Sequence, residues 1–266
     1  MTDLYAVIGN PVAHSKSPQI HAEFAKQTKQ DMAYEAILAP LEDFPATVEK
    51  LRREGYRGVK VTVPFKREAW RIASDLAARA LDAESVNTLS FENERILGDN
   101  TDGAGLVNDI VGNLKFDIRN TRILLMGAGG AARGVIMPLA EQRPRQIVIA
   151  NRTMEKALQL AEKFPITAKT YSDLAGDRFD IVINATSSSL KGELPPLPSG
   201  IFADNALAYD MMYGKQTPFM EFAREQGASE IADGLGMLVE QAAESFCIWR
   251  GVRPETKAVI EKLKSC

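Results

Sequence analysis

The clearest indication of the fold is the stretch RILLMGAGGAARGV, residues 122–135. A short, mainly apolar run predicts a strand, and a glycine-rich loop follows it and opens a helix. The loop, residues 127–132, has the spacing G-x-G-x-x-A. Its first glycine permits a tight turn, its second lets the backbone approach a pyrophosphate, and its alanine keeps the helix close to the strand. With phosphates at the helix N-terminus, the stretch predicts a Rossmann-like dinucleotide-binding domain.

The end of the next predicted strand, QIVIA (146–150), favours NADP over NAD. NAD sites typically place Asp or Glu at this strand end to bind the ribose 2′-hydroxyl. Here Asn151 takes that position and Arg152 follows it. A guanidinium group pairs with a 2′-phosphate and stacks on adenine, whereas a carboxylate repels the phosphate. Lys156, one helical turn further on, adds positive charge. The alternative is that Arg152 only faces solvent.

Strands alternate with helices on both sides of the loop, which predicts α/β architecture with mainly parallel sheet. The predicted strands are LYAVIG (4–9), YEAIL (34–38), VKVTV (59–63), ITAKT (166–170), DIVIN (180–184) and ALAYDM (206–211), with a hairpin over 86–100. Residues 66–80 and 103–114 each read as one helix, and 191–205 as an irregular loop. More than a hundred patterned residues precede the glycine loop, so a separate substrate domain is expected.

One lysine has an unusual predicted position. In VKVTVPFK (59–66) the valines alternate with Lys60 and Thr62, as in a strand that buries one face. Pro64 ends the strand, so Lys66 lies in the first turn of the next helix, where the macrodipole disfavours a cation. Asp102, if adjacent, would favour the ammonium form. We interpret Lys66 as an acid/base group; the alternatives are a surface lysine, or Asp102 as base with Lys66 as electrostatic clamp.

Two clusters of short polar side chains flank predicted helices in this region. Ser17 and Pro18 stand at the expected N-cap and first helical positions, and the hydroxyls of Ser15 and Ser17 suit a carboxylate, although capping alone also explains Ser17. The second cluster is GDNTDG (98–103), where capping is again the alternative. Asn87 stands in an apolar strand and needs a partner if it is buried.

Composition narrows the class of protein. The 266-residue chain is 45% apolar and 25% charged, with a net charge of −3, so no basic field indicates nucleic acid or membrane binding. Cys247 and Cys266 are too few for a disulfide framework. With no signal peptide and no long apolar run, we expect a cytoplasmic protein. His14 and His21 read as surface or packing residues, and no Cys/His spacing indicates a metal.

The order of motifs resembles that of bacterial shikimate dehydrogenases over essentially the whole chain. The motifs are GNPVAHSKSP, KVTVPFK, VNTL, GDNTDG, GAGGAARG, NRT, NATS, YDMMYG and DGLGMLVEQAA. The resemblance implies NADPH-dependent reduction of 3-dehydroshikimate to shikimate, a step of chorismate and aromatic amino acid biosynthesis. It also implies a discontinuous substrate domain, residues 1–101 and 237–266, around an NADP-binding domain, residues 102–236.

The resemblance also implies roles for single residues. Lys66 and Asp102 would be catalytic. The substrate would be bound by Ser15, Ser17, Thr62, Asn87, Asp102, Tyr213 and Gln241. The cofactor would be bound by Gly127, Ala128, Gly129, Gly130, Ala131, Asn151, Arg152, Thr153, Lys156, Thr186, Met211, Gly234 and Met237. Lys156 departs from the family pattern, in which arginine is common, and a lysine keeps the charge but loses the fork geometry.

Three other functions compete with this interpretation. One is a quinate/shikimate dehydrogenase with relaxed substrate or cofactor specificity. Arg152 argues against an NAD-dependent form of this enzyme. Another is a folate dehydrogenase of similar plan, which the SKSP and NTDG clusters disfavour. The third is a non-enzymatic NADP-binding sensor, which retention of Lys66 and Asp102 disfavours. For the oligomeric state we expect either a monomer or a homodimer.

Overall fold

The computed structural model describes residues 2–188 and 192–265. The chain divides into two compact units, residues 1–105 with 238–266 and residues 106–237. Their boundaries fall inside two helices, α5 (Asp102–Val107) and α9 (Leu235–Arg250). We call them the first and the second unit and describe each by itself.

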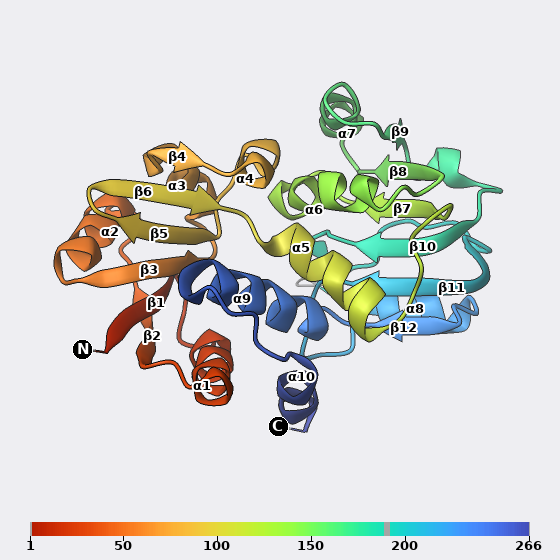
Figure 1. The fold of residues 1–266 in the computed structure, drawn as a ribbon. Helices are drawn as coiled ribbons and strands as arrows, with labels where there is room; N and C mark the ends of the chain where they lie inside the picture. The colour runs from red at the N-terminus through yellow and green to blue at the C-terminus, as the bar shows by residue number, and fades with distance from the viewer. Residues whose placement is uncertain (1, 189–191, 266) are drawn as a thin grey trace. The chain divides into compact units, whose positions relative to one another are not determined.

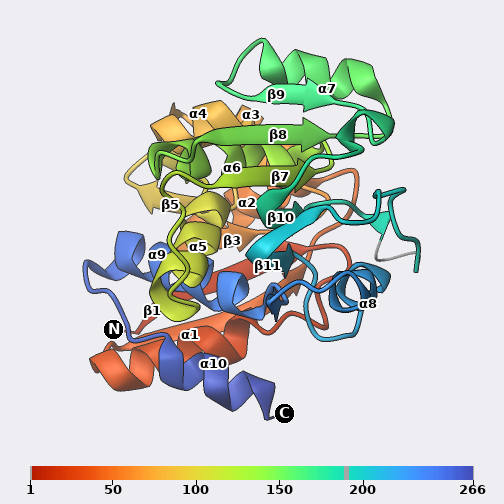
Figure 2. The ribbon, with the colours of Figure 1, turned by 90° about the vertical axis from the view of Figure 1, so that its right-hand side faces the viewer.

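The second unit is built on a parallel sheet, whose strands follow the order β12-β11-β10-β7-β8-β9 (Figures 1 and 2). All pairings in this sheet are parallel. The strands are β7 (Arg122–Met126), β8 (Gln146–Ala150), β9 (Thr167–Lys169), β10 (Phe179–Asn184), β11 (Phe202–Asp210) and β12 (Glu230–Ala232). Between them lie α6 (Gly130–Glu141), α7 (Met154–Ala161), the short helix η2 (Ser172–Leu174) and α8 (Pro218–Glu225).

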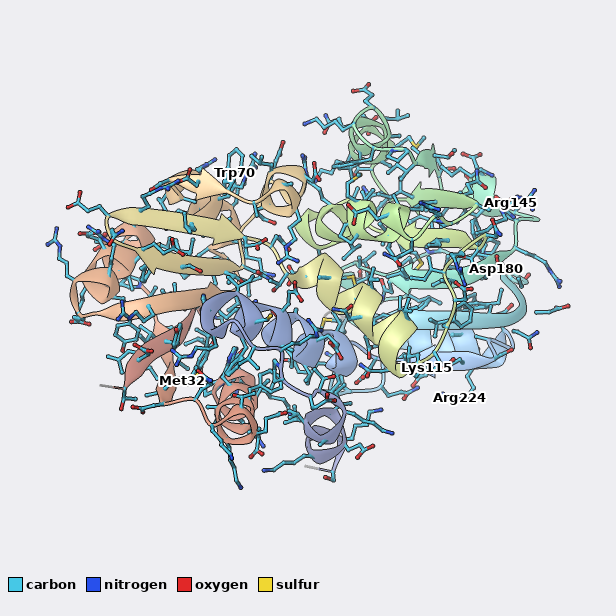
Figure 3. All side chains as sticks on the ribbon, viewed as in Figure 1. Met32, Trp70, Lys115, Arg145, Asp180 and Arg224 are labelled. Atoms are coloured by element: carbon cyan, nitrogen blue, oxygen red, sulfur yellow. The ribbon has the colours of Figure 1, made fainter. Side chains whose placement is uncertain are left out.

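Both faces of this sheet are buried, because alternate residues of each strand enter different cores. Ile123 and Leu125 of β7 pack in one core with α6, whereas Leu124 and Met126 pack in the other with residues of α8. Two buried faces explain why the strands read as continuous apolar runs. Asp180 near the start of β10 and Arg145 just before β8 mark the amino ends of the strands (Figure 3). The glycine loop follows the opposite end of β7.

The first unit contains a mixed sheet of order β2-β1-β3-β5-β6-β4 (Figure 1). β1 pairs in parallel with β2 and β3, whereas β5 and β6 form the predicted antiparallel hairpin. The strands are β1 (Asp3–Gly9), β2 (Met32–Leu38), β3 (Tyr56–Val61), β4 (Asp75–Leu76), β5 (Thr88–Glu92) and β6 (Arg95–Asp99). The helices are α1 (Ser17–Thr28), α2 (Phe44–Arg53), α3 (Lys66–Ile72) and α4 (Ala78–Ala83). The predicted α/β class is confirmed in both units.

The C-terminal helices belong to the first unit. From α9, Trp249 donates to the carbonyl of Leu89 on β5 at 3.2 Å, and the Arg250 guanidinium pairs with Asp3 on β1. From α10 (Lys257–Lys264), Lys262 pairs with Glu23 of α1. These contacts join residues more than 150 positions apart, so this unit is discontinuous in sequence.

Several predicted elements need correction. Residues 66–80 are not one helix: α3 ends at Ile72 and β4 follows, because the amide of Ser74 bonds to Ile96 and that of Ala77 to Gly98. The helix predicted over 103–114 changes to a π-helix, η1 (Asn108–Asn113), after α5. β11 begins at Phe202, inside the loop predicted for 191–205, of which residue 191 lies outside the described residues.

In residues 2–188 and 192–265, no helix combines the length and the apolar character needed to cross a membrane.

Candidate functional site

Lys66 and Asp102 form an ion pair in the first unit. The Nζ of Lys66 donates to Oδ2 of Asp102 at 2.6 Å. Each residue begins a helix: Lys66 is the first residue of α3 and Asp102 the first of α5. The prediction that a helix begins at Lys66 is therefore confirmed. The carboxylate complements the positive end of α5, and it compensates the ammonium for its unfavourable place at α3.

The other oxygen of Asp102 is held by Asn87. The Asn87 amide donates to Oδ1 of Asp102 at 2.8 Å, while its own Oδ1 accepts from the backbone N–H of Thr101 at 3.0 Å and from the hydroxyl of Thr88 at 2.8 Å. Asn87 is fully buried. The prediction that it needs partners is confirmed, and its bonds fix the orientation of both the amide and the carboxylate.

The turn before α5 is fixed independently. The side-chain amide of Asn100 donates to two atoms of Ser85, the backbone carbonyl oxygen at 3.0 Å and the hydroxyl oxygen at 2.9 Å. Its Oδ1 accepts from the backbone N–H of Asp102 at 3.1 Å. Asn100 thus caps the start of α5, the alternative role considered for this cluster, and leaves the Asp102 carboxylate to its side-chain partners.

The charges around Asp102 keep it ionised. Burial acts to raise the pKa of Asp102, but the ammonium groups of Lys66 and Lys60 and the hydrogen bonds from Lys66 and Asn87 outweigh it. The net effect lowers the pKa of this carboxyl below its usual value. A permanent carboxylate beside Lys66 can stabilise an ammonium that donates a proton and receives it back.

Lys60 is one of the charged groups that act on Asp102. Its alternation with valines indicated that it lies on the exposed, polar face of a half-buried strand. It is only 4% exposed, whereas Val63, expected on the buried face, is 64% exposed. β3 ends at Val61, before Val63, and Ser245 of α9 covers Lys60. The local pattern could not reveal this, because α9 lies 185 residues further along the chain.

The residues predicted to bind the substrate carboxylate, Ser15 and Ser17, lie at the start of α1. Ser17 is buried, and its backbone N–H donates to the hydroxyl of Ser15 at 3.2 Å. The N-cap position belongs to Lys16, and Ser17 is the first helical residue. The expectation that Ser17 caps the helix is therefore wrong by one position: Ser15 supplies the oxygen that a backbone N–H needs.

Two further predicted residues, Thr62 and Gln241, also belong to the first unit. Thr62 follows β3, where its N–H donates to Ile8 at 2.9 Å and its carbonyl accepts from Phe65, one residue before Lys66. Gln241 lies on α9, and its backbone carbonyl accepts the hydroxyl of Thr101 at 3.0 Å. Thr101 immediately precedes Asp102, so α9 is tied to the segment that carries the ion pair.

In the second unit, the glycine loop has the geometry that a pyrophosphate needs. Gly127 has a φ of +100°, and a Cβ there would lie 3.2 Å from Ala185 and Thr186, so a glycine is required. A Cβ at Gly129 would meet no protein atom within 4 Å, which leaves the backbone open to a ligand. Ala132 is fully buried in the core beside β7. No described side chain caps α6, so its first N–H groups remain available to an anion.

The predicted 2′-phosphate residues lie at the same end of the sheet. Asn151 follows β8 and donates to the carbonyl of Thr153 at 2.8 Å, which shapes the turn into α7. Arg152 and Lys156 are exposed. A cavity of about 400 Å³ joins this turn to the glycine loop; its lining comprises residues 127–131, Asn151, Arg152, Tyr171, 185–188 and 193–196.

A buried polar network supports the neighbouring strand ends. Thr186 donates its hydroxyl to Oδ1 of Asn184 at 2.7 Å, and the Asn184 amide donates to Asp210 at 3.1 Å. Asp210 also accepts the hydroxyl of Thr217 at 2.6 Å. Sequence inspection missed Asn184, Asp210 and Thr217; the motif NATS contained the signal, a polar residue ending an apolar strand.

The remaining predicted cofactor residues lie beyond β11. A Cβ on Gly234 would lie 2.3 Å from the carbonyl oxygen of Met211, so only glycine allows this approach. Met237 is buried in the core that also contains Leu125. Tyr213 is partly buried in the same unit. Of the predicted substrate residues, Tyr213 alone belongs to the second unit.

The residues that the structure describes contain no cluster of three or more His, Cys, Asp or Glu side chains able to hold a metal ion. His14 is exposed, and His21 is buried against the ring of Tyr34, with 4.1 Å between ring centroids. Cys247 is a free thiol, and Cys266 lies outside the described residues.

Comparison with known proteins gives consistent matches along the chain. Three family models match: the shikimate dehydrogenase substrate binding domain over residues 7–89, shikimate / quinate 5-dehydrogenase over 107–191, and the shikimate 5′-dehydrogenase C-terminal domain over 234–264. A shikimate dehydrogenase (NADP(+)) from Nitrosospira multiformis is 61% identical over 270 residues, which cover 100% of this chain and 98% of the relative.

Solved structures agree with the sequence matches. An Ael1 enzyme from Pseudomonas putida has a TM-score of 0.95 at 50% identity, with 98% of each chain covered. Shikimate 5-dehydrogenase from Thermus thermophilus, solved in complex with NADP(H) and shikimate, has a TM-score of 0.89 at 31% identity, with 99% of each chain covered. The resemblance seen in the sequence motifs is confirmed, and the chain belongs to the shikimate dehydrogenase family of NADP-dependent oxidoreductases.

Proposed function

We propose that this chain catalyses the reversible reduction of 3-dehydroshikimate to shikimate and that Lys66 transfers the proton. The observation that carries the proposal is the 2.6 Å contact between Lys66 Nζ and the partly buried, ionised Asp102. NADPH, when bound, supplies the hydride. In the reducing direction the ammonium of Lys66 gives a proton to the alkoxide that forms on the substrate; in the oxidising direction the amine accepts it. Asp102 stabilises the ammonium and orients it.

The first unit is the proposed substrate-binding unit. Ser15 and Ser17, at the start of α1, present hydroxyls suited to the single carboxylate of the substrate. Thr62, Asn87, Asp102 and Gln241 supply short polar groups for the ring hydroxyls and the reacting oxygen. Tyr213, in the second unit, is proposed as a further substrate contact. A small polyhydroxylated acid needs several convergent polar groups of this kind.

The second unit is the proposed NADP-binding unit. The open backbone at Gly129 and the uncapped start of α6 support pyrophosphate binding by residues 127–131. The exposed side chains of Arg152 and Lys156, beside the turn formed by Asn151 and Thr153, support binding of the 2′-phosphate. Thr186, Met211, Gly234 and Met237 are proposed to lie on the nicotinamide side. We further propose that the enzyme acts in the cytoplasm as a monomer or a homodimer.

Activity towards quinate is the second candidate function, because the family model that matches residues 107–191 covers both substrates. A spectrophotometric panel distinguishes the possibilities: NADP and NAD, each with shikimate and with quinate. We expect the highest kcat/KM for shikimate with NADP. Comparable values with quinate would reassign the chain to the dual-specificity enzymes. Cofactor binding with no turnover in any of the four mixtures would support a sensor.

A further inference from the structure

Lys60 is buried, and among the residues that the structure describes no carboxylate lies within ion-pair distance of it. Its ammonium donates to the hydroxyls of Thr88 at 3.2 Å, Thr101 at 3.0 Å and Ser245 at 2.9 Å. An ammonium has three N–H groups and no acceptor, so these neutral hydroxyls satisfy it completely. A fully buried lysine held only by hydroxyls is unusual, because lysines are almost never fully buried unless they are paired.

The charges around Lys60 act in opposite directions. Burial lowers its pKa most strongly, Lys66 and Arg79 lower it further, and Asp102 and Asp99 raise it; the resulting pKa is about 7. His21, from α1, is also affected by the charge of Lys60, and burial together with that charge lowers the pKa of His21 well below its usual range. Lys60 can therefore gain or lose its proton within the physiological pH range.

A chain of hydrogen bonds joins Lys60 to the proposed catalytic pair. Because Lys60 only donates, the Thr88 oxygen accepts from it, and the Thr88 hydroxyl donates to Oδ1 of Asn87, 2.8 Å away, with the hydroxyl oxygen of Ser245 as a second neighbour at 2.9 Å. Ser245 directs its own hydrogen to the carbonyl of Gln241 at 2.9 Å. With Oδ1 of Asn87 occupied by donors, its amide nitrogen must face Oδ1 of Asp102.

We infer that Lys60 is a positioning residue for the Lys66–Asp102 pair: its ammonium sets the direction of the hydrogen bonds through Thr88 and Asn87 that hold the Asp102 carboxylate. When Lys60 loses its proton, its nitrogen becomes an acceptor for the Thr88 hydroxyl, and Asn87 loses one of the donors that orient it. The inference rests on the proposed function, because its consequence is a change in shikimate turnover.

Two substitutions that each remove one hydroxyl from Lys60 test the chain. Thr88→Val removes the shorter of two links to Oδ1 of Asn87, 2.8 Å through Thr88 against 3.2 Å through Thr101. Ser245→Ala removes a hydroxyl that contacts Thr88 at 2.9 Å but directs its hydrogen to Gln241 and has no hydrogen bond of its own to Asn87 among the described residues. We expect Thr88→Val to lower kcat for shikimate oxidation about tenfold, as loss of one oriented hydrogen bond would, and Ser245→Ala to lower it less than about threefold. Equal losses in the two variants would overturn the inference in favour of general packing.

The charge itself is tested by Lys60→Met, with thermal unfolding followed in parallel. We expect the ratio of kcat/KM for wild type to that of Lys60→Met to fall as the pH rises through about 7, the pKa of Lys60. Titrations that both proteins share cancel in this ratio. A ratio that does not change with pH would overturn the positioning role. A wild-type protein inactive with shikimate would overturn the proposed function itself, which the same assay reports separately.

Discussion

The ammonium of Lys66 lies 2.6 Å from the carboxylate of Asp102, although 36 positions separate the two residues in sequence. Each residue is the first of a helix, so the backbone from which each side chain extends is held by a helix terminus. Asn87, just before β5, holds the second carboxylate oxygen. These contacts orient the pair, as proton transfer to and from a bound substrate requires.

The cofactor preference depends on Arg152. We expect Arg152→Ala to weaken NADP binding by about 1–3 kcal/mol, through loss of a charged hydrogen bond to the 2′-phosphate, and to change NAD binding much less. Fluorescence titration of the wild type and the variant with NADP and with NAD measures the two affinities. Arg145→Ala is the matched control, because Arg145 is also exposed but lies at the amino end of β8. Equal losses of NADP and NAD affinity would show that Arg152 does not bind the 2′-phosphate.

Substitutions of Ser17 and Ser15 should distinguish an effect on substrate binding from an effect on protein stability. We expect Ser17→Ala to raise KM for shikimate more than KM for NADP, with little loss of stability, because Ser17 is not the N-cap residue. Ser15→Ala removes the acceptor of the Ser17 N–H and should lower the free energy of unfolding by about 0.5–1.5 kcal/mol as well. Urea unfolding and steady-state kinetics of both variants provide the comparison. An unchanged KM in Ser17→Ala would exclude that hydroxyl from the substrate site.

The buried charge of Lys60 also predicts how stability depends on pH. Its pKa falls from 10.5 in the unfolded chain to about 7 in the fold, so between these values the unfolded state binds more protons. The free energy of unfolding should therefore rise with pH across this window, by up to about 1.4 kcal/mol per pH unit from this group. Lys60→Met should remove that rise, as urea unfolding at several pH values would measure. Identical pH dependence in both proteins would contradict a pKa near 7.

The sequence predicts best what local pattern determines. The strands RILLM and QIVIA end where expected, because a sheet buried on both faces needs uninterrupted apolar runs. The position of Lys66 followed from Pro64 and the helical pattern after it. In contrast, residues 73–77 read as helix and instead pair with β6, because non-local hydrogen bonds override the preference of an alanine-rich segment.

Lys60 shows why part of the candidate site could not be predicted. A lysine that alternates with valines reads as solvent-facing, and it would face solvent if β3 had only its sheet neighbours. Ser245 of α9 covers it, and Thr101 before α5 contributes another partner. Because those partners come from distant parts of the chain, no window of sequence around Lys60 contains the signal for its burial.

Asp102 has two proposed roles, in catalysis and in substrate binding. Its substitution should therefore change the kinetic parameters differently from substitution of Lys66. We expect Asp102→Asn to lower kcat and raise KM for shikimate together, because the carboxylate both holds Lys66 and is proposed to contact substrate. Steady-state kinetics with shikimate and NADP measure the two parameters. A loss confined to KM would limit Asp102 to binding.

The turnover number of Lys66→Ala in shikimate oxidation with NADP tests the role of Lys66 in proton transfer most directly. We expect a kcat lowered by about 10²–10⁴, the usual contribution of a positioned proton-transfer group, with a smaller change in KM. Arg71→Ala, an exposed cation on the same helix, is the control and should retain the wild-type kcat. A Lys66→Ala enzyme with near-normal kcat would contradict the assignment of Lys66 as the proton-transfer residue.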